Sequence, residues 1–315
     1  MIELVAESEA MREVVRVASR AASTDANVLV TGESGAGKDA LALYVHVQSR
    51  RAARPFVKID CAALPAELIE AELFGYERGA FTGATQAKPG RIEAAHGGTL
   101  ALDEIAHLTV DAQAKLLRVI ERREFERLGG RRTVRVDARL LALTNVDLED
   151  AVGRRAFRPD LFYRLNVVRI HVPPLRERRE DVAPLAARFA EVYAAKHGRR
   201  AHKIAPEALA MLAAYDFPGN VRELAHVIER AVIVAEGAHI GVGELPDPLV
   251  LAARLRRQQS RRPTLAEVEA EYVAETLALT KGNKAKAARL LGISRKNLYE
   301  RLARKAMMNV EDNEN

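Results

Sequence analysis

The stretch Asn27–Lys38, Asn-Val-Leu-Val-Thr-Gly-Glu-Ser-Gly-Ala-Gly-Lys, decides the fold class of this chain. Its first five residues predict a short buried strand, and a helical pattern over Lys38–Arg50 follows the glycine-rich turn. In such a unit the backbone N–H groups of the turn and the helix dipole point at phosphate oxygens. The predicted phosphate-binding residues are Gly32, Glu33, Ser34, Gly35, Ala36, Gly37, Lys38 and Asp39.

Four further apolar runs of strand length extend this unit into a sheet, at 56–59, 99–102, 140–143 and 167–170. They alternate with helical stretches, which predicts a parallel sheet covered on both faces. No strand is expected after Arg176, where helical stretches near 180–197, 206–214 and 219–236 predict a small lid. The expected organisation is a nucleotide-binding α/β subdomain over 1–175, a helical lid over 176–243, a linker over 244–262 and an all-α domain over 263–308.

Composition bounds the class of protein. The chain has 315 residues, a single cysteine, Cys61, and no apolar run near eighteen residues, which predicts a cytoplasmic protein without an internal disulfide or a membrane span. Residues 254–305 hold 14 Lys and Arg against 5 Asp and Glu, whereas residues 1–253 hold 35 of each. The basic excess therefore belongs to the C-terminal segment and indicates a polyanion such as nucleic acid; a solvated basic face is the alternative.

Two acidic residues, Asp103 and Glu104, end the apolar run 99–102. In a nucleotide hydrolase Asp103 would hold Mg²⁺, and Glu104 would polarise the attacking water. A surface pair that caps the next helix is the alternative, and the strand position and the spacing from Lys38 weigh against it.

The segment Gly79–Ala84, Gly-Ala-Phe-Thr-Gly-Ala, lies between these two halves of the nucleotide site. Its glycines allow a sharp, mobile loop, and an exposed Phe81 beside Thr82 would indicate a partner surface. A hairpin turn with Phe81 in the core is the alternative.

In this order, the phosphate-binding loop, the Gly79–Ala84 segment and the Asp103–Glu104 strand end resemble the bacterial enhancer-binding proteins, the AAA+ activators that remodel sigma-54 RNA polymerase. The resemblance implies hydrolysis of ATP with Mg²⁺. It also implies a stroke in which the nucleotide state moves a sigma-54 contact loop formed by Gly79, Ala80, Phe81, Thr82, Gly83 and Ala84.

Three more segments take roles from this resemblance. Thr144 and Asn145 would be the sensor that contacts the γ-phosphate or water. Arg158 and Arg164, in Phe157–Leu165, would be arginine fingers that enter the neighbouring subunit's site, although residue physics alone reads them as surface arginines. Arg222 would reach the nucleotide from the lid. Fingers supplied by a neighbour require a ring, and the family's ring is a hexamer.

Two acidic positions stand out, one against phosphate-binding loops in general and one against the family pattern. Asp39 follows Lys38 where many phosphate-binding loops have Ser or Thr, and an acidic residue there fits this family. Asp60 stands where the family carries an Asn that holds the catalytic Glu idle. Two carboxylates at positions 60 and 104 would repel each other, so whether Asp60 acts as this switch stays open.

The C-terminal segment has helix-turn-helix spacing, with a short helix over Lys284–Leu291, a turn at Gly292–Ile293 and a second helix capped by Ser294. Residues 282–294 resemble the Fis-type module that ends many enhancer-binding proteins. Candidate DNA-binding residues are Lys284, Ser294, Arg295, Lys296, Asn297, Tyr299, Arg301 and Arg304. An apolar stripe on the preceding helix predicts dimerisation, and a three-helix oligomerisation cap is the alternative.

The resemblance predicts an ATP-driven activator that contacts sigma-54 polymerase and double-stranded enhancer DNA and assembles as DNA-binding dimers and a hexameric ring. A repressor with a vestigial ATPase and a generic AAA+ machine are the competing interpretations. About 25 residues precede the first strand, which is too few for a receiver domain. If Met1 is the natural start, we expect control by a separate regulatory protein, by expression level or by nucleotide supply; otherwise a sensor domain has been removed.

Overall fold

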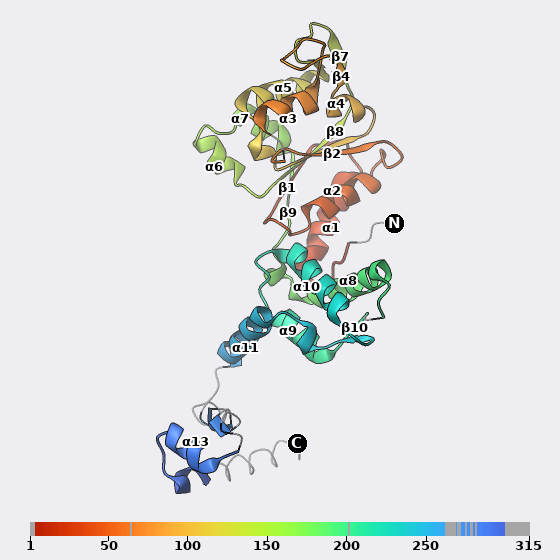
Figure 1. Cartoon of the computed structure of the whole chain (residues 1–315). Coiled ribbons are helices and arrows are strands. Elements are labelled where there is room, and N and C mark those ends of the chain that lie inside the picture. The colour runs from red at the N-terminus through yellow and green to blue at the C-terminus, as the bar shows by residue number, and fades with distance from the viewer. Residues whose placement is uncertain are drawn as a thin grey trace. The chain divides into compact units, whose positions relative to one another are not determined.

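The computed structural model of the protein describes residues 4–63, 65–200, 202–261, 269, 272–274, 276–277, 280 and 282–299. The chain divides into two compact units, 1–250 and 251–315. The first unit contains a parallel sheet with its covering helices and a helical lid (Figure 1). Within the described ranges, no helix combines the length and the apolar character that a membrane crossing needs.

Five parallel strands form the central sheet in the order β2-β5-β8-β1-β9. They are β1 Val28–Thr31, β2 Phe56–Asp60, β5 Thr99–Asp103, β8 Arg139–Thr144 and β9 Val168–His171. All five coincide with the apolar runs of the sequence, so the predicted α/β class is confirmed. Their register brings the carboxyl ends to one edge, where Asp60 pairs with Asp103 and Thr31 with Thr144.

Helices cover both faces of this sheet. They are α1 Glu9–Ala22, α2 Lys38–Val47, α3 Ala66–Phe74, α4 Arg91–Ala94, α5 Val110–Arg122, α6 Leu148–Gly153 and α7 Pro159–Leu165, with a 3₁₀ turn at Ile105–His107. Successive strand residues point to opposite faces. Val28 and Val30 therefore pack in a core with α1 and α2, whereas Leu29 packs in a second core with α3, α5 and α7.

Two short antiparallel hairpins lie outside the main sheet. One pairs β3 Gly75–Tyr76 with β4 Lys88–Pro89, and the other pairs β6 Glu124–Glu126 with β7 Thr133–Arg135. They contact each other, since the N–H of Glu77 donates to the carbonyl of Leu128 over 3.0 Å and the N–H of Leu128 donates to that of Gly75 over 3.0 Å. The first hairpin encloses the Gly79–Ala84 loop, so the second hairpin supports that loop from the side.

The lid follows two 3₁₀ turns, Leu175–Glu177 and Arg179–Asp181, and contains α8 Val182–His197, α9 Pro206–Ala214 and α10 Asn220–Val234. Its helices occupy the stretches expected from the sequence. The expectation of no strand after Arg176 is wrong, because β10 Lys203–Ile204 and β11 His239–Ile240 form a parallel pair. Two residues are too few to produce an alternating pattern that a sequence would reveal.

The segment 244–262, expected as a linker, is largely helical. A 3₁₀ turn at Val242–Glu244 precedes α11 Asp247–Arg261. Pro248 lies in the first turn of this helix, where a missing N–H removes no hydrogen bond. The Leu, Ala, Arg and Gln residues that follow are good helix formers, so a composition that suggested a linker also supports a helix.

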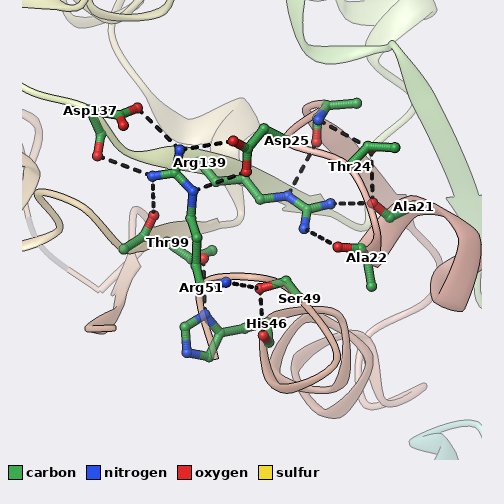
Figure 2. Close-up of polar contacts among 12 residues, drawn as sticks. Ala21, Ala22, Thr24, Asp25, His46, Ser49, Arg51, Thr99, Asp137 and Arg139 are labelled. Atoms are coloured by element: carbon green, nitrogen blue, oxygen red, sulfur yellow. Dashed lines mark hydrogen bonds and ion pairs between the residues drawn. The ribbon is translucent and has the colours of Figure 1, made fainter. Parts of the chain in front are cut away.

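A polar cluster built on two buried arginines, Arg139 and Arg51, joins the amino ends of two strands to the ends of α1 and α2 (Figure 2). Arg139, which begins β8, is 2% exposed and donates to the carbonyls of Ala21 at 2.8 Å and Ala22 at 3.3 Å. Arg51 forms ion pairs with Asp25 at 3.0 Å and with Asp137 at 3.2 Å. Arg139 thus binds carbonyls at the end of α1, such as that of Ala22, which are costly to bury unpaired.

The second unit contains α13 Lys284–Leu290 and a helical stretch at 295–299. Its core consists of Val273, Ala287, Ala288 and Leu298, with Leu277, Leu291 and Ile293 packed against it. Asn283 caps α13 by accepting from the N–H of Lys286 at 3.1 Å. Arg301 and Arg304, predicted to bind DNA, lie outside the described residues.

Candidate functional site

The phosphate-binding loop lies at the carboxyl edge of the sheet, between β1 and α2. Gly35 has φ +74° and Gly37 has φ +105°, left-handed values that glycine adopts without a Cβ clash. Lys38, at the start of α2, is 6% exposed, and its Nζ donates to the carbonyls of Gly32 at 3.0 Å and Glu33 at 3.2 Å. The loop therefore has the curled backbone and the buried cation that phosphate binding needs.

A pocket lies in front of this loop. It is lined by eight predicted site residues, Ser34, Gly35, Gly37, Lys38, Asp39, Asp103, Glu104 and Arg222. Phe189, Val221 and Ala225 of the lid complete the lining and were not predicted. The apolar side chains on α8 and α10 give the pocket an apolar wall opposite the charged loop.

Asp103 and Glu104 end β5 beside the loop. Glu104 has φ +50°, and one of its carboxylate oxygens lies 3.9 Å from Lys38 Nζ. The other oxygen accepts from the N–H of Asn145 at 3.2 Å. The fold thus brings together Lys38, Glu104 and Asn145, which lie on three different segments of the chain.

Lys58 is a site residue that sequence reasoning missed. Its Nζ lies 2.9 Å from a carboxylate oxygen of Asp103, and it forms a second ion pair with Asp39 at 2.5 Å. Burial opposes the charge of Lys58, but the two ion pairs outweigh it and raise the pKa of the ammonium group. The signal available in the sequence was a lysine within an otherwise apolar strand.

Asp60 accepts a hydrogen bond from the N–H of Ala62 at 2.9 Å, and its side chain is exposed. Its neighbour Cys61 is buried, and burial, together with the negative charges of Asp60, Asp103 and Glu104, raises the pKa of the thiol to about 12. Cys61 is therefore an inert core residue and not a nucleophile.

The remaining predicted residues of the α/β part, Thr144, Arg158 and Arg164, do not line the pocket. Thr144 is buried at the end of β8, and its hydroxyl accepts from the N–H of Val146 at 3.0 Å. Arg158 pairs with Asp160 at 2.7 Å, and Arg164 pairs with Glu121 at 3.0 Å. Neither arginine lines the pocket of its own chain.

The lid contacts the phosphate-binding loop through the start of α10. Arg222 donates from its guanidinium to the hydroxyl of Ser34 at 3.0 Å. The N–H of Val221 donates to the carbonyl of Gly35, also at 3.0 Å. Gly35 must be glycine here, since a Cβ would lie 2.5 Å from the carbonyl oxygen of Gly219.

The Gly79–Ala84 loop is closed at its base by a hydrogen bond from the N–H of Gly79 to the carbonyl of Ala84 at 2.9 Å. Gly79 and Gly83 have φ +84° and +100°. Phe81 is 42% exposed, and its ring lies edge-on to that of Tyr76 at 4.9 Å between centroids. Phe81 is thus outside the core, and Thr82 next to it is exposed.

In the second unit, five of the predicted DNA-binding side chains are exposed on or next to the second helix: Ser294, Arg295, Lys296, Asn297 and Tyr299. The hydroxyl of Ser294 accepts from the N–H of Asn297 at 3.2 Å, as an N-cap does. Lys284 is also exposed, and its Nζ lies 4.8 Å from the centre of the Tyr299 ring.

Three family models match the chain in succession. Residues 4–171 match the sigma-54 interaction domain, residues 176–262 match the AAA+ ATPase lid domain, and residues 264–304 match the bacterial regulatory proteins of the Fis family. The lid match extends over the segment expected as a linker.

Curated relatives and a solved structure are similar over almost the whole chain. Regulatory protein AtoC of Escherichia coli K12 is 43% identical over 95% of this chain and 67% of AtoC. Transcriptional regulatory protein FlbD of Caulobacter vibrioides is 44% identical over 95% of this chain and 69% of FlbD. NtrX from Brucella abortus, crystallised in complex with ATP, has a TM-score of 0.73 and 36% identity over 96% of this chain and 69% of NtrX.

The three matched domains follow one another in the order expected from the sequence, an α/β nucleotide-binding part, a helical lid and a C-terminal helix-turn-helix. Two relatives are more than 40% identical over two thirds of their own length, and the fold agrees with that of a solved relative. The chain therefore belongs to the sigma-54-dependent transcriptional activators, with an AAA+ ATPase domain and lid followed by a Fis-type helix-turn-helix domain.

Proposed function

We propose that this protein binds enhancer DNA, hydrolyses ATP and uses the Gly79–Ala84 loop to convert the closed complex of sigma-54 RNA polymerase to the open complex. The observation that carries the proposal is one pocket that unites the phosphate-binding loop, the Asp103–Glu104 strand end and Arg222 of the lid. The related NtrX was crystallised with ATP, and this chain has the same fold.

The residues fit the chemistry of ATP hydrolysis. Lys38 and the N–H groups of the loop would bind the phosphates, and Arg222 would contact them from the lid. Glu104, fixed by the N–H of Asn145 at 3.2 Å, would orient and polarise the attacking water. The ammonium group of Lys38 lies 3.9 Å from a carboxylate oxygen of Glu104. The cation that would bind phosphate and the carboxylate that would polarise water could therefore act on one ATP molecule.

Mg²⁺ fits the carboxylates of this pocket. Among the described residues, no three His, Cys, Asp or Glu side chains are grouped to hold a metal without help. Mg²⁺ is commonly held by one or two carboxylates together with substrate phosphates, so it would arrive with ATP and neutralise phosphate charge. Asp103, next to the loop, would hold it, with Asp39 as the second carboxylate at the site.

A ring of subunits would complete the site. Arg158 and Arg164 do not line the pocket of their own chain, and each is held by a nearby carboxylate, Asp160 or Glu121. In a hexamer these arginines would face the neighbouring pocket and stabilise charge in the transition state. Arginine fingers of this kind accelerate hydrolysis about a thousandfold or more.

The Gly79–Ala84 loop would be the part that contacts sigma-54. Phe81 offers 42% of its surface, and the glycines on either side permit the loop to change shape. The second unit would hold the protein at an upstream site, with Arg295, Lys296 and Asn297 at the start of a helix suited to the major groove.

The test mixes the purified chain with sigma-54 and ADP–aluminium fluoride, which imitates the phosphoryl group in transfer. We expect a complex on a native gel that requires the nucleotide, and we expect Thr82→Ala to abolish the complex while it retains ATP turnover. No complex despite normal turnover would contradict the sigma-54 role and favour another target for the ATPase. No turnover would favour a DNA-binding regulator with a vestigial nucleotide domain.

A further inference from the structure

Asn220, the first residue of α10, is a buried polar residue that the sequence analysis assigns to no site. It is fully buried and has φ +53°, a left-handed value that is uncommon outside glycine. Its amide nitrogen donates to a carboxylate oxygen of Glu33 at 3.0 Å and to the carbonyl of Ser34 at 3.1 Å. Its amide oxygen accepts from the N–H of Leu175 at 2.8 Å.

These bonds join three parts of the molecule. Glu33 and Ser34 belong to the phosphate-binding loop, Leu175 lies where the α/β part meets the lid, and Asn220 begins a lid helix. The amide nitrogen and the amide oxygen of Asn220 both form their hydrogen bonds within the protein. A buried amide that is satisfied in this way fixes the geometry of its partners.

Glu33 has two faces with different contacts. Its backbone carbonyl accepts from Lys38 Nζ at 3.2 Å, on the side of the loop where phosphate would bind. Its carboxylate points to the lid, where it forms a two-pronged pair with Arg176 at 2.6 and 2.9 Å and accepts from Asn220. Arg176 and then Asn220 lower the pKa of Glu33 to about 2, so the carboxylate is charged at any physiological pH.

We propose that Glu33 and Asn220 form the link through which the occupant of the phosphate-binding loop sets the position of the lid. Any phosphate oxygen that Lys38 binds shares its ammonium group with the Glu33 carbonyl. A shift of that peptide moves the Glu33 carboxylate, and the carboxylate moves Asn220 and α10. Asn220 is thus a positioning residue of the lid, and this role rests on the proposed binding of ATP.

The phosphate-binding loop and the lid are packed so closely that they have little room to move independently. Gly35 and Gly219 are so near that a Cβ on Gly35 would clash at 2.5 Å, and the N–H of Val221 bonds the Gly35 carbonyl at 3.0 Å. Since packed contacts move together and do not stretch, a displacement at Glu33 is passed on and not absorbed.

The test uses near-isosteric variants and measures binding in place of hydrolysis. Asn220→Asp replaces the amide donor by an oxygen and sets a carboxylate beside that of Glu33. We expect the Kd for a fluorescent ADP analogue to rise roughly tenfold, a typical size for coupling between sites. We also expect ADP to slow hydrogen exchange of the Val221 N–H in the wild type and to have no such effect in Asn220→Asp.

A second variant tests the direction of the bond. Glu33→Gln should raise the Kd by a smaller factor, because Arg176 loses its charged partner while the loop keeps its shape. Combined with Asn220→Asp it should recover at least part of the affinity, since the amide introduced at position 33 can donate to the carboxylate introduced at position 220. Glu229→Gln is the matched control, because Glu229 pairs with Lys196 and His197 within the lid only.

The outcomes separate the link from the function on which it rests. A wild-type protein that does not bind the ADP analogue would overturn both. Binding by the wild type with an unchanged Kd in Asn220→Asp, or a double variant no better than the single one, would overturn the link alone. A fall in melting temperature without a change in Kd would show that Asn220 only supports the fold. If Asn220→Asp does not fold, an unchanged Kd and exchange response in Glu33→Gln overturns the link.

Discussion

Gly129→Ala tests whether the β6–β7 hairpin holds the Gly79–Ala84 loop in position. Gly129 has φ +69°, and a Cβ added there would lie 2.9 Å from both Cα and Cβ of Ala80. Carbon atoms in good contact are about 3.5 to 4.0 Å apart, so Ala80 has to move by roughly 0.6 Å or more. One of the crowded atoms is backbone, so the loop itself must shift.

The control for this variant is Gly198→Ala in the lid. Gly198 has φ +61° and open space around the position of its Cβ, so this change adds only left-handed strain. That strain is about 1–2 kcal/mol, and each kcal/mol lowers the Tm of a domain of this size by about 2–4 °C. Both variants should therefore melt several degrees below the wild type, and only Gly129→Ala displaces Ala80.

The assay is a titration of sigma-54 onto each variant in ADP–aluminium fluoride, with ATP turnover measured in parallel. We expect Gly198→Ala to bind sigma-54 like the wild type and Gly129→Ala to bind about tenfold more weakly, which corresponds to about 1.4 kcal/mol. Turnover should persist in both, because neither glycine lines the nucleotide pocket. Equal sigma-54 affinity in the two variants would refute the reasoning that the hairpin positions the loop.

Four further changes have defined outcomes. Burial lowers the pKa of His46, so folding favours the neutral ring. The stability that the neutral ring contributes is complete above about pH 6.5, the ordinary pKa of histidine, and declines as the pH falls from there toward the lower pKa of the folded state. His46→Asn should therefore give thermal melts that depend less on pH between 7.5 and 5. Arg139→Met removes the hydrogen bonds to the carbonyls of Ala21, Ala22 and Ala26 and should lower the free energy of unfolding by about 3 kcal/mol in urea titrations. Asp60→Asn keeps an acceptor for the hydrogen bond from the N–H of Ala62 and restores the Asn that in the family holds the catalytic Glu idle, so it should reduce basal ATP turnover; an unchanged rate would show that position 60 does not act on Glu104. Arg295→Ala should weaken a specific DNA site by roughly 1–3 kcal/mol in footprint titrations, and an unchanged footprint would remove this residue from the interface.

The parts of the fold that sequence predicted are those governed by local patterns. Each strand of the sheet is a short apolar run, and the turn at Gly32–Lys38 has glycines where the backbone has positive φ at Gly35 and Gly37. The β10–β11 pair gave no signal, since two residues have no period. The sequence of α11 does not distinguish a helix from a linker, because its Arg and Gln residues suit both a helix and an exposed connection.

Contacts between distant segments were harder to predict. Lys58 could not be predicted as a site residue, because nothing in β2 itself shows that Asp39 and Asp103 lie beside it. Asn220 lies two positions before Arg222, yet the role proposed for it depends on Glu33, which is 187 residues away. The family resemblance predicts that Arg222 contacts the nucleotide, but it assigns no role to the buried side-chain amide of Asn220.

The two edges of the sheet differ in a way that explains where motion is expected. At the amino edge, Arg139 and Arg51 tie strand starts to the ends of α1 and α2 through buried hydrogen bonds (Figure 2). At the carboxyl edge, the connections run through the loop and the lid, with Asn220 at their centre. The closely packed core around the sheet has low compressibility and resists internal rearrangement, whereas the lid can move as a body. A change at the phosphate-binding loop should therefore move the lid and leave the sheet in place, which makes the sheet the fixed frame against which both the lid and the Gly79–Ala84 loop act.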